Sequence, residues 1–221
     1  MCGRFALTLP PEAMAQLFAA VPGNDLPDVP NFNICPTNTV HAVTSEDGQR
    51  RLRAMRWGFL PHWYKNPSDG PLLINARSET IAEKPAFRSA ARARRCLIPA
   101  TGFYEWTKDD EGKRLPWYIA PTEGAALVFA GVWQDWVKGD DAFTTCAIVT
   151  TDANARMQTI HHRMPVILSQ DDWPLWLGEA GHGAATLMKA AAEDALRFHR
   201  VDPKVNSNRV SGPELIEPFE A

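Results

Sequence analysis

Cysteine is scarce in this sequence, and its four copies follow no structural pattern. Cys2, Cys35, Cys96 and Cys146 are scattered over 221 residues. No two of them have the C-x-x-C spacing typical of zinc sites, and they are too few for a disulfide scaffold. We therefore expect four free thiols in a reducing compartment, and no metal or other cofactor.

Long hydrophobic runs are also missing. No stretch reaches the roughly 20 apolar residues that a membrane-spanning helix needs, and the N-terminus lacks the apolar run of a signal peptide. The sequence has no Gly/Ser linker, low-complexity tract or internal repeat, and at 45% hydrophobic residues it can bury a full core. These features predict one domain over residues 1–221, a cytoplasmic location and no membrane partner. We also expect a monomer.

The hydrophobic pattern that is present predicts an α+β fold. Helical spacing of apolar residues is found over residues 10–21, 84–96, 171–178 and 182–196. Strand-like runs cover residues 51–59, 115–121, 126–137, 143–151 and 164–169. The strands follow one another at short intervals without regular β-α-β alternation. We expect a curled, barrel-like antiparallel sheet with helices at its periphery.

Positive charge is concentrated in one part of the chain. Residues 50–95 contain 11 Lys and Arg but three acidic residues, a net charge of +8, whereas the whole chain carries −3. Such a segregation suits a polyanionic partner. A solvated helix face explains Arg92, Arg94 and Arg95 equally well.

Aromatic residues are interleaved with these basic residues. Trp57, Phe59 and Trp63 lie within RWGFLPHW, a pattern typical of surfaces that stack on single-stranded bases. Packing in the core is the competing interpretation, and for Trp57 the more common one.

The cysteine at position 2 has unusual chemistry available to it. Initiator methionine is normally removed before a small residue, so we expect the mature chain to begin at Cys2. Its α-amine and its thiol would then lie on adjacent carbons. Their ordinary pKa values are about 8 and about 8.5. Such a group condenses with an aldehyde to a Schiff base and then a thiazolidine. Alternatively, the thiol attacks an acyl group with the amine as its base. Gly3 permits close backbone approach and Arg4 can contact a phosphate.

Three further motifs carry candidate polar residues. Glu105 in GFYEW lies between aromatic residues, where desolvation raises a carboxyl pKa and suits proton transfer; a solvent-facing strand residue is the alternative. In IHHRMP, one of two histidines can move protons while Arg163 binds an anion, although surface histidines in a turn fit equally. Asn75 in INARSET can hold an oxygen, with Arg77 on the same strand face.

Taken together, six motifs in order resemble the SRAP (SOS-response-associated peptidase) family. They are MCGRF, RWG followed by P-x-W, INARSET, KPAFR, RCLIPATGFYEW and HHRMP, spanning Cys2 to Ser169. Members of this family process abasic sites in single-stranded DNA. Their N-terminal cysteine forms a thiazolidine with the open sugar aldehyde and so shields the lesion. The resemblance implies a bacterial DNA-repair protein that associates with the nucleoid when bound to DNA. It also implies autoproteolytic release of the initiator methionine, and β-elimination of the Schiff base would give a weak lyase activity.

The resemblance also implies roles for individual residues. Cys2 is the crosslinking residue, Asn75 positions the N-terminus, Glu105 releases the methionine and moves protons, and His161 assists Schiff-base formation and reversal. The implied DNA contacts are Arg4, Arg77, Arg88 and Arg163 for phosphates, and Trp57 and Trp63 for bases. Two residues depart from the family pattern, Cys35 in place of a small residue and His162 in place of an acid.

Two other functions stay open at this point. The first is a cysteine peptidase acting in trans, with Cys2, His161 and Asn75 as its catalytic residues. The second is a non-catalytic module for single-stranded DNA, in which Cys2 is incidental.

Overall fold

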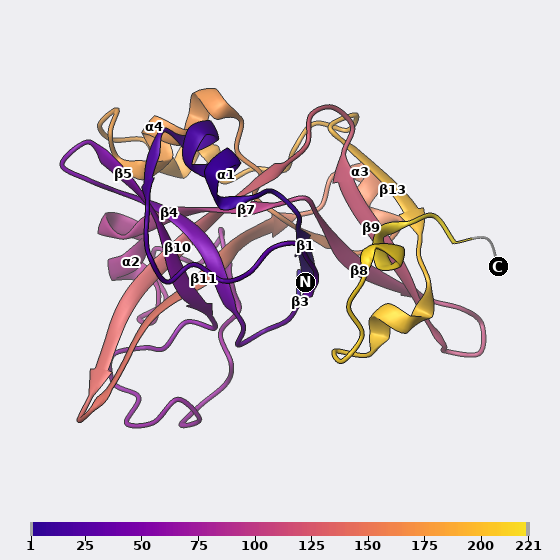
Figure 1. Cartoon of the computed structure of the whole chain (residues 1–221), viewed down its shortest axis with the longest axis horizontal. Coiled ribbons are helices and arrows are strands. Elements are labelled where there is room, and N and C mark those ends of the chain that lie inside the picture. The colour runs from indigo at the N-terminus through magenta and orange to yellow at the C-terminus, as the bar shows by residue number, and fades with distance from the viewer. Residues whose placement is uncertain (1, 220–221) are drawn as a thin grey trace.

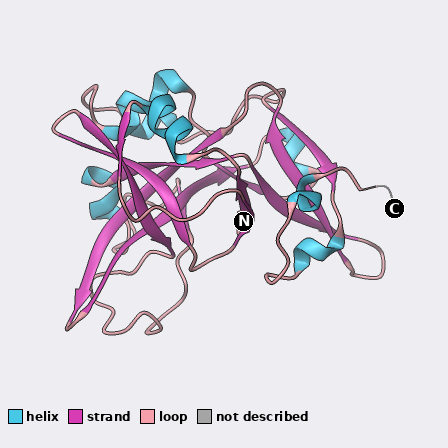
Figure 2. Ribbon diagram, viewed as in Figure 1, coloured by secondary structure: helices cyan, strands magenta, loops and turns pink. Residues whose placement is uncertain are grey.

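Two β-sheets with short peripheral helices make up the fold (Figure 1, Figure 2). The structure is a computed structural model that describes residues 2–219. The larger sheet forms the left part of the view, the smaller sheet forms the right part, and the N-terminus lies between them (Figure 1). The predicted α+β class is confirmed.

Five strands of the larger sheet close into a barrel. These strands are β4 (Thr39–Glu46), β5 (Gln49–Trp57), β7 (Arg95–Ala100), β10 (Leu127–Lys138) and β11 (Asp141–Asp152). Antiparallel pairing runs from β11 through β10, β7 and β4 to β5, and a parallel pairing of β5 with β11 closes the ring. Three short strands extend this sheet, β2 (Ala20–Pro22), β6 (Asn75–Arg77) and β12 (Arg163–Pro165). The barrel-like core is therefore confirmed, with parallel pairs added to a mainly antiparallel sheet.

The second sheet has five strands in the order β13-β9-β8-β1-β3. Their bounds are β1 (Phe5–Leu7), β3 (Asn31–Ile34), β8 (Gly102–Lys108), β9 (Arg114–Pro121) and β13 (Leu196–Arg200). Because β1 lies between β3 and β8, the N-terminal residues are held inside a sheet rather than at its edge.

Short helices connect and cover the sheets. The α-helices are α1 (Pro11–Phe18), α2 (Arg88–Ala93), α3 (Ala155–Gln158) and α4 (Trp173–Leu177). The 3-10 helices are η1 (Gln170–Asp172), η2 (Ala184–Leu187), η3 (Pro203–Asn206) and η4 (Pro213–Ile216). Helix α1 begins with a proline and ends where Ala19 adopts a left-handed conformation with φ 49°, so it is shorter than predicted. Within residues 2–219, no helix is long and apolar enough to cross a membrane.

The helix predicted over residues 182–196 is wrong. Only Ala184–Leu187 is helical there, as a single 3-10 turn. The side chain of Asn154 donates hydrogen bonds to the carbonyls of Ala191 and Ala192, which a helix would need for its own amides. Tertiary contacts therefore override the helix propensity of the alanines.

Aromatic packing joins the N-terminal strand to the barrel. The ring of Phe5 lies 5.1 Å from that of Trp57 and 5.9 Å from that of Phe129, and Phe129 contacts Phe103 at the same 5.9 Å. All four residues are buried, and each buried aromatic side chain contributes up to about 3 kcal/mol. The segment that carries Cys2 is thus firmly attached to the core.

Candidate active site

The backbone of Cys2–Arg4 runs beside strand β8, which carries Glu105. Phe5 pairs with Phe103, and the amide of Tyr104 donates a 2.9 Å hydrogen bond to the carbonyl of Arg4. Glu105 therefore lies beside the start of the chain, as the resemblance implies.

Asn75 holds this segment from the opposite side. Its Nδ2 donates a 3.0 Å hydrogen bond to the carbonyl oxygen of Cys2, while its Oδ1 is buried and has no hydrogen-bond partner among the described residues. Parallel pairing of Asn75 with Ile148 on β11 fixes the residue, and Arg77 points to solvent at the end of the same short strand. The Nδ2 group of Asn75 thus holds the backbone of Cys2, while its buried Oδ1 can still accept a hydrogen bond.

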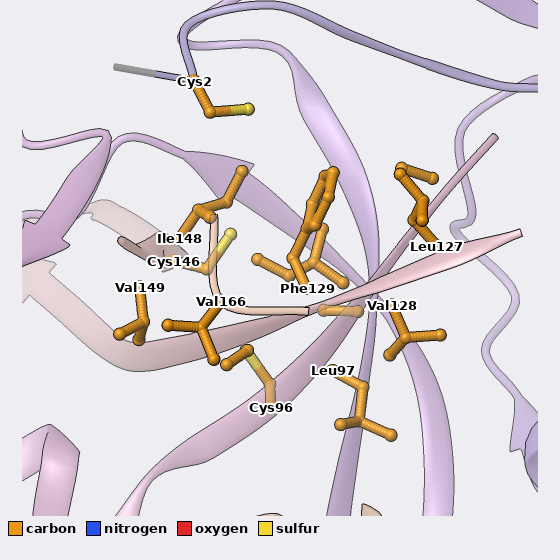
Figure 3. Packing of buried hydrophobic residues seen from close by; sticks show 14 of the residues in the cluster. Cys2, Cys96, Leu97, Leu127, Val128, Phe129, Cys146, Ile148, Val149 and Val166 are labelled. Carbon is orange, nitrogen blue, oxygen red and sulfur yellow. The ribbon is translucent and has the colours of Figure 1, made fainter. Parts of the chain in front are cut away.

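The thiol of Cys2 is buried, at 0% exposure. Burial raises its pKa well above the ordinary value, the nearby Glu105 carboxylate raises it further, and a backbone hydrogen bond from Arg4 lowers it. Figure 3 shows Cys2 at the edge of the hydrophobic cluster that fills the barrel. The expected removal of the initiator methionine concerns Met1, which lies outside the described residues.

Glu105 is buried as well, with 3% of its surface exposed. Burial raises the pKa of its carboxyl, and the positive charge of Arg114 acts in the opposite direction. The alternative in which Glu105 faces solvent is therefore excluded. A carboxyl with a raised pKa can carry a proton closer to neutral pH than an exposed one.

His161 is half-buried and fixed by the backbone that follows it. Its Nδ1 accepts a 2.9 Å hydrogen bond from the amide of Arg163, so the neutral ring carries its proton on Nε2. Burial lowers the pKa of this imidazole, which favours the neutral form. The ring of His162 stacks on it at 4.4 Å and lies on the exposed side.

Glu105 and His161 line one small cavity of about 270 Å³, whereas Cys2 and Asn75 are not among its lining residues. Its lining residues are Gly3, Arg4, Glu105, Trp106, Arg114, His161 and Asn206. Sequence reasoning missed Arg114 and Asn206 as members of this site. Asn206 accepts a 2.6 Å hydrogen bond from Nε1 of Trp106 across a sequence separation of 100 residues, and no local motif signals that contact.

The prediction that Arg163 holds a DNA phosphate is corrected. Its side chain is 6% exposed and donates to Glu79 at 2.8 Å, to Asp152 at 2.5 Å and to the carbonyl of Thr150. Two carboxylates already neutralise the guanidinium, so it ties β12 to β11 and to the segment that follows β6.

The prediction that Trp57 stacks on bases is also corrected. The side chain is fully buried, and its Nε1 donates a 3.0 Å hydrogen bond to the carbonyl of Ile74. Trp63 instead remains available, because 47% of its surface is exposed. It lines an open cavity of about 610 Å³ together with Arg88, which is exposed too.

Arg4, which lines the cavity, also lies near Cys35. Arg4 donates 2.7 Å hydrogen bonds to Oδ1 of Asn33 and to the carbonyl of Val205, which fixes its guanidinium. The thiol of Cys35 donates to the carbonyl of Asn33 at 3.3 Å, burial raises its pKa, and Arg4 lowers it. The departure at position 35 is therefore accommodated without disturbing the site.

Comparison with known proteins identifies relatives over the whole chain. The family model described as SOS response associated peptidase (SRAP) matches residues 1–208. Abasic site processing protein YoqW of Bacillus subtilis is 34% identical over 98% of this chain and 99% of its own. Abasic site processing protein YedK of Escherichia coli is 30% identical over 99% of this chain and 100% of its own.

Solved structures share the fold. A protein from Bacteroides thetaiotaomicron superimposes with a TM-score of 0.87 at 23% identity, covering 99% of this chain and 100% of its own. A phage-related protein from Bordetella bronchiseptica gives a TM-score of 0.72 at 28% identity, covering 90% of this chain and 94% of its own.

Proposed function

The chain belongs to the SOS response associated peptidase (SRAP) family, and on that premise we propose that it processes abasic sites by trapping them on Cys2. The substrate is an abasic site in single-stranded DNA, whose sugar equilibrates between a closed ring and an open aldehyde. The product is a thiazolidine that joins the sugar to the N-terminal cysteine. Release of Met1 precedes this reaction, because the α-amine of Cys2 must be uncovered.

The first step brings the aldehyde to the amine. The Nε2–H of neutral His161 donates to the ring oxygen of the closed sugar and so favours its opening. Asn75 holds the carbonyl of Cys2, which orients the amine and the thiol of the same residue toward the cavity.

The covalent steps form a closed proton cycle around Glu105. The amine adds to the aldehyde carbon to give a carbinolamine, and protonated Glu105 delivers its proton to the departing hydroxyl, which leaves as water. The thiol of Cys2 then adds to the iminium carbon and gives its proton to the Glu105 carboxylate. One water is released in total and Glu105 returns to its starting state. The raised pKa of both groups supports this exchange between them.

The observation that carries the proposal is that four separate segments meet around Cys2 and the cavity that its neighbour Gly3 lines. Cys2, Asn75, Glu105 and His161 come from the N-terminus, β6, β8 and the loop before β12. Their contacts favour condensation over peptide hydrolysis in trans. A peptidase needs a thiolate activated by a histidine base, whereas here the thiol pKa is raised and the imidazole offers Nε2–H as a donor.

Strand binding is proposed for exposed basic and aromatic residues outside this cavity. Arg77 and Arg88 would contact phosphates, and Trp63 would stack on a base. The missing base is the recognition signal, so no base readout is needed. We also propose that the protein acts in the cytoplasm as a monomer, and that weak lyase activity arises by β-elimination from the Schiff base.

A denaturing gel with an abasic oligonucleotide tests this proposal. The parent protein should give a shifted band that resists denaturation, and Cys2→Ala should give none. Cys35→Ala is the matched control, since it removes the half-buried thiol near Arg4 and should leave the band in place. A shifted band from Cys2→Ala would reject the assignment. Equal non-covalent binding of intact and abasic strands, without any band, would support the binding-module alternative.

A further inference from the structure

Two guanidinium groups lie over the ring of Trp106 at the mouth of the catalytic cavity. The Arg114 guanidinium is 5.1 Å from the ring centroid and that of Arg4 is 5.9 Å. Trp106 is itself oriented by its hydrogen bond to Asn206. Cation–π contact therefore holds both arginines beside the cavity that contains Glu105.

The two arginines differ in what occupies their donors. Arg4 uses its Nη1 in hydrogen bonds to Asn33 and Val205. Among residues 2–219, the Arg114 side chain makes neither a hydrogen bond nor an ion pair. It is exposed and lies at the start of β9, directly after the β8–β9 hairpin. The N–H donors of the Arg114 guanidinium therefore have no acceptor among residues 2–219.

The positive charge of Arg114 lies at the cavity that Glu105 and His161 line. The positive charge of Arg114 opposes the rise that burial causes in the pKa of Glu105. It also lines the same cavity as Gly3 and His161. An anion bound by Arg114 would therefore lie next to the reacting carbon.

We propose that Arg114 binds the phosphate that flanks the reacting sugar, and so selects sugars embedded in a nucleic-acid backbone over free aldehydes. This inference rests on the proposed function, because it assigns a specificity-determining residue to the same site. A guanidinium matches phosphate in a bidentate geometry, and its contact with Trp106 places it in advance. The phosphate brings the sugar with it, which raises the local concentration of the aldehyde at the amine.

Two small sugars isolate this contact. 2-Deoxyribose and 2-deoxyribose 5-phosphate both open to an aldehyde, and only the second carries a phosphate. Because the free 5-hydroxyl of 2-deoxyribose also closes a pyranose ring, its open fraction is smaller, so every rate compared here is divided by the rate of the same sugar with free cysteine. Each is incubated with protein whose first residue is Cys2, and intact-protein mass spectrometry follows adducts that carry the sugar less one water. The parent should react about tenfold faster with the phosphorylated sugar. Arg114→Ala should reduce that preference close to one, because any effect of the lost charge on Glu105 changes both rates alike and cancels in the ratio.

Control variants separate this role from others. Lys138→Ala removes an exposed charge at the far end of β10 and should keep the full preference. Arg114→Lys should keep part of it, because a charge remains without the bidentate fork. An exposed residue at the start of a strand is not expected to be needed for folding, and thermal unfolding of Arg114→Gln checks this point.

Three outcomes would overturn the inference. The first is an unchanged preference in Arg114→Ala and Arg114→Gln. The second is an equal slowing of both sugars with a shifted pH profile, which would mean that Arg114 acts only through Glu105. The third is loss of the preference in Lys138→Ala as well. Adducts that persist in Cys2→Ala would instead contradict the proposed function, so the two failures are distinguishable.

Discussion

The N-terminal corner (Cys2–Arg4 with Asn75, Glu105 and His161) and the interior of the barrel both contain fully buried thiols, yet the polar groups around these thiols differ. Cys2, Cys96 and Cys146 are each 0% exposed, and burial raises the pKa of all three, to about 12 for Cys146. Figure 3 shows them in the same hydrophobic cluster. Burial alone therefore makes a thiol less acidic and does not make it reactive.

The difference lies in the polar groups around each thiol. Cys2 has Asn75 on its carbonyl, Glu105 close to its sulfur and a cavity beside it. Cys96 and Cys146 lie among aliphatic and aromatic side chains. Cys146 raises the pKa of Cys96 beyond the effect of burial, and Arg53 lowers it. A proton acceptor and access for a substrate distinguish the two regions. Removing those features should make Cys2 as unreactive toward an aldehyde as we expect Cys96 and Cys146 to be.

The largest effect is expected from Glu105→Gln. The amide keeps the shape of the side chain but can neither deliver nor accept the proton, so crosslinking at neutral pH should slow by about 10²- to 10³-fold. Single-turnover kinetics with an abasic oligonucleotide measure this rate. A variant with parent-like rates would show that the proton cycle does not pass through Glu105.

Arg163→Met tests whether Arg163 stabilises the fold beside His161 instead of binding DNA. Removing the guanidinium leaves two largely exposed carboxylates, at 43% and 80% side-chain exposure, and should lower the free energy of unfolding by about 1 kcal/mol. Arg163 lowers the pKa of Glu79 from 4.5 to about 2. This stabilisation is present above pH 4.5 and is lost as pH falls toward 2, so parent and variant should converge in acid. Denaturant unfolding at several pH values measures the difference. An unchanged stability combined with weaker DNA binding would restore the phosphate-binding interpretation.

Cys146→Ala should separate the two kinds of thiol. Loss of the buried sulfur should cost about 1 kcal/mol in unfolding free energy, because it leaves a small void in the barrel. Crosslinking should keep its parent rate. Thermal unfolding and the gel assay on the same preparation provide both readings. A crosslinking defect without a stability defect would contradict the comparison.

The smallest effect concerns the stability of Glu105→Gln. Because burial raises the pKa of Glu105, the folded protein binds a proton more tightly than the unfolded chain does. Stability of the parent therefore falls as pH rises from about 4.5 through the raised pKa, and the variant lacks this loss. Glu105→Gln should be more stable than the parent at neutral pH and equal to it near pH 4. A variant that is less stable at both pH values would show that the carboxyl is not strained by burial.

Short sequence motifs pointed to the candidate residues of the N-terminal corner, whose roles in the reaction stay predictions. Cys2, Asn75, Glu105 and His161 each lie in a short pattern whose chemistry can be read from neighbouring residues. Arg114 and Asn206 could not be found in that way, because a hairpin and the 3-10 turn η3 bring them to Trp106.

Burial was the main physical property that the motifs left undecided. Trp57 and Trp63 share one basic-aromatic stretch, but the first lies in the core and the second on the surface. Arg163 lies two residues after His161, yet its guanidinium forms ion pairs with the carboxylates of Glu79 and Asp152, which the motif itself does not contain. Strands β5, β9, β10 and β11 were predicted from their β-rich hydrophobic runs, whereas β4, β7 and β8 were not. The alanine-rich segment before β13 follows its tertiary hydrogen bonds instead of its helix propensity.

Peptide mapping of the crosslinked protein tests the central claim most directly. After nuclease digestion of the DNA and cleavage by trypsin, the sugar should be found on the peptide Cys2–Arg4. The α-amine and thiol of that peptide should both resist further modification, as a thiazolidine requires. A sugar attached to a lysine or to Cys35, or a Cys2 peptide with a free thiol after crosslinking, would contradict the account.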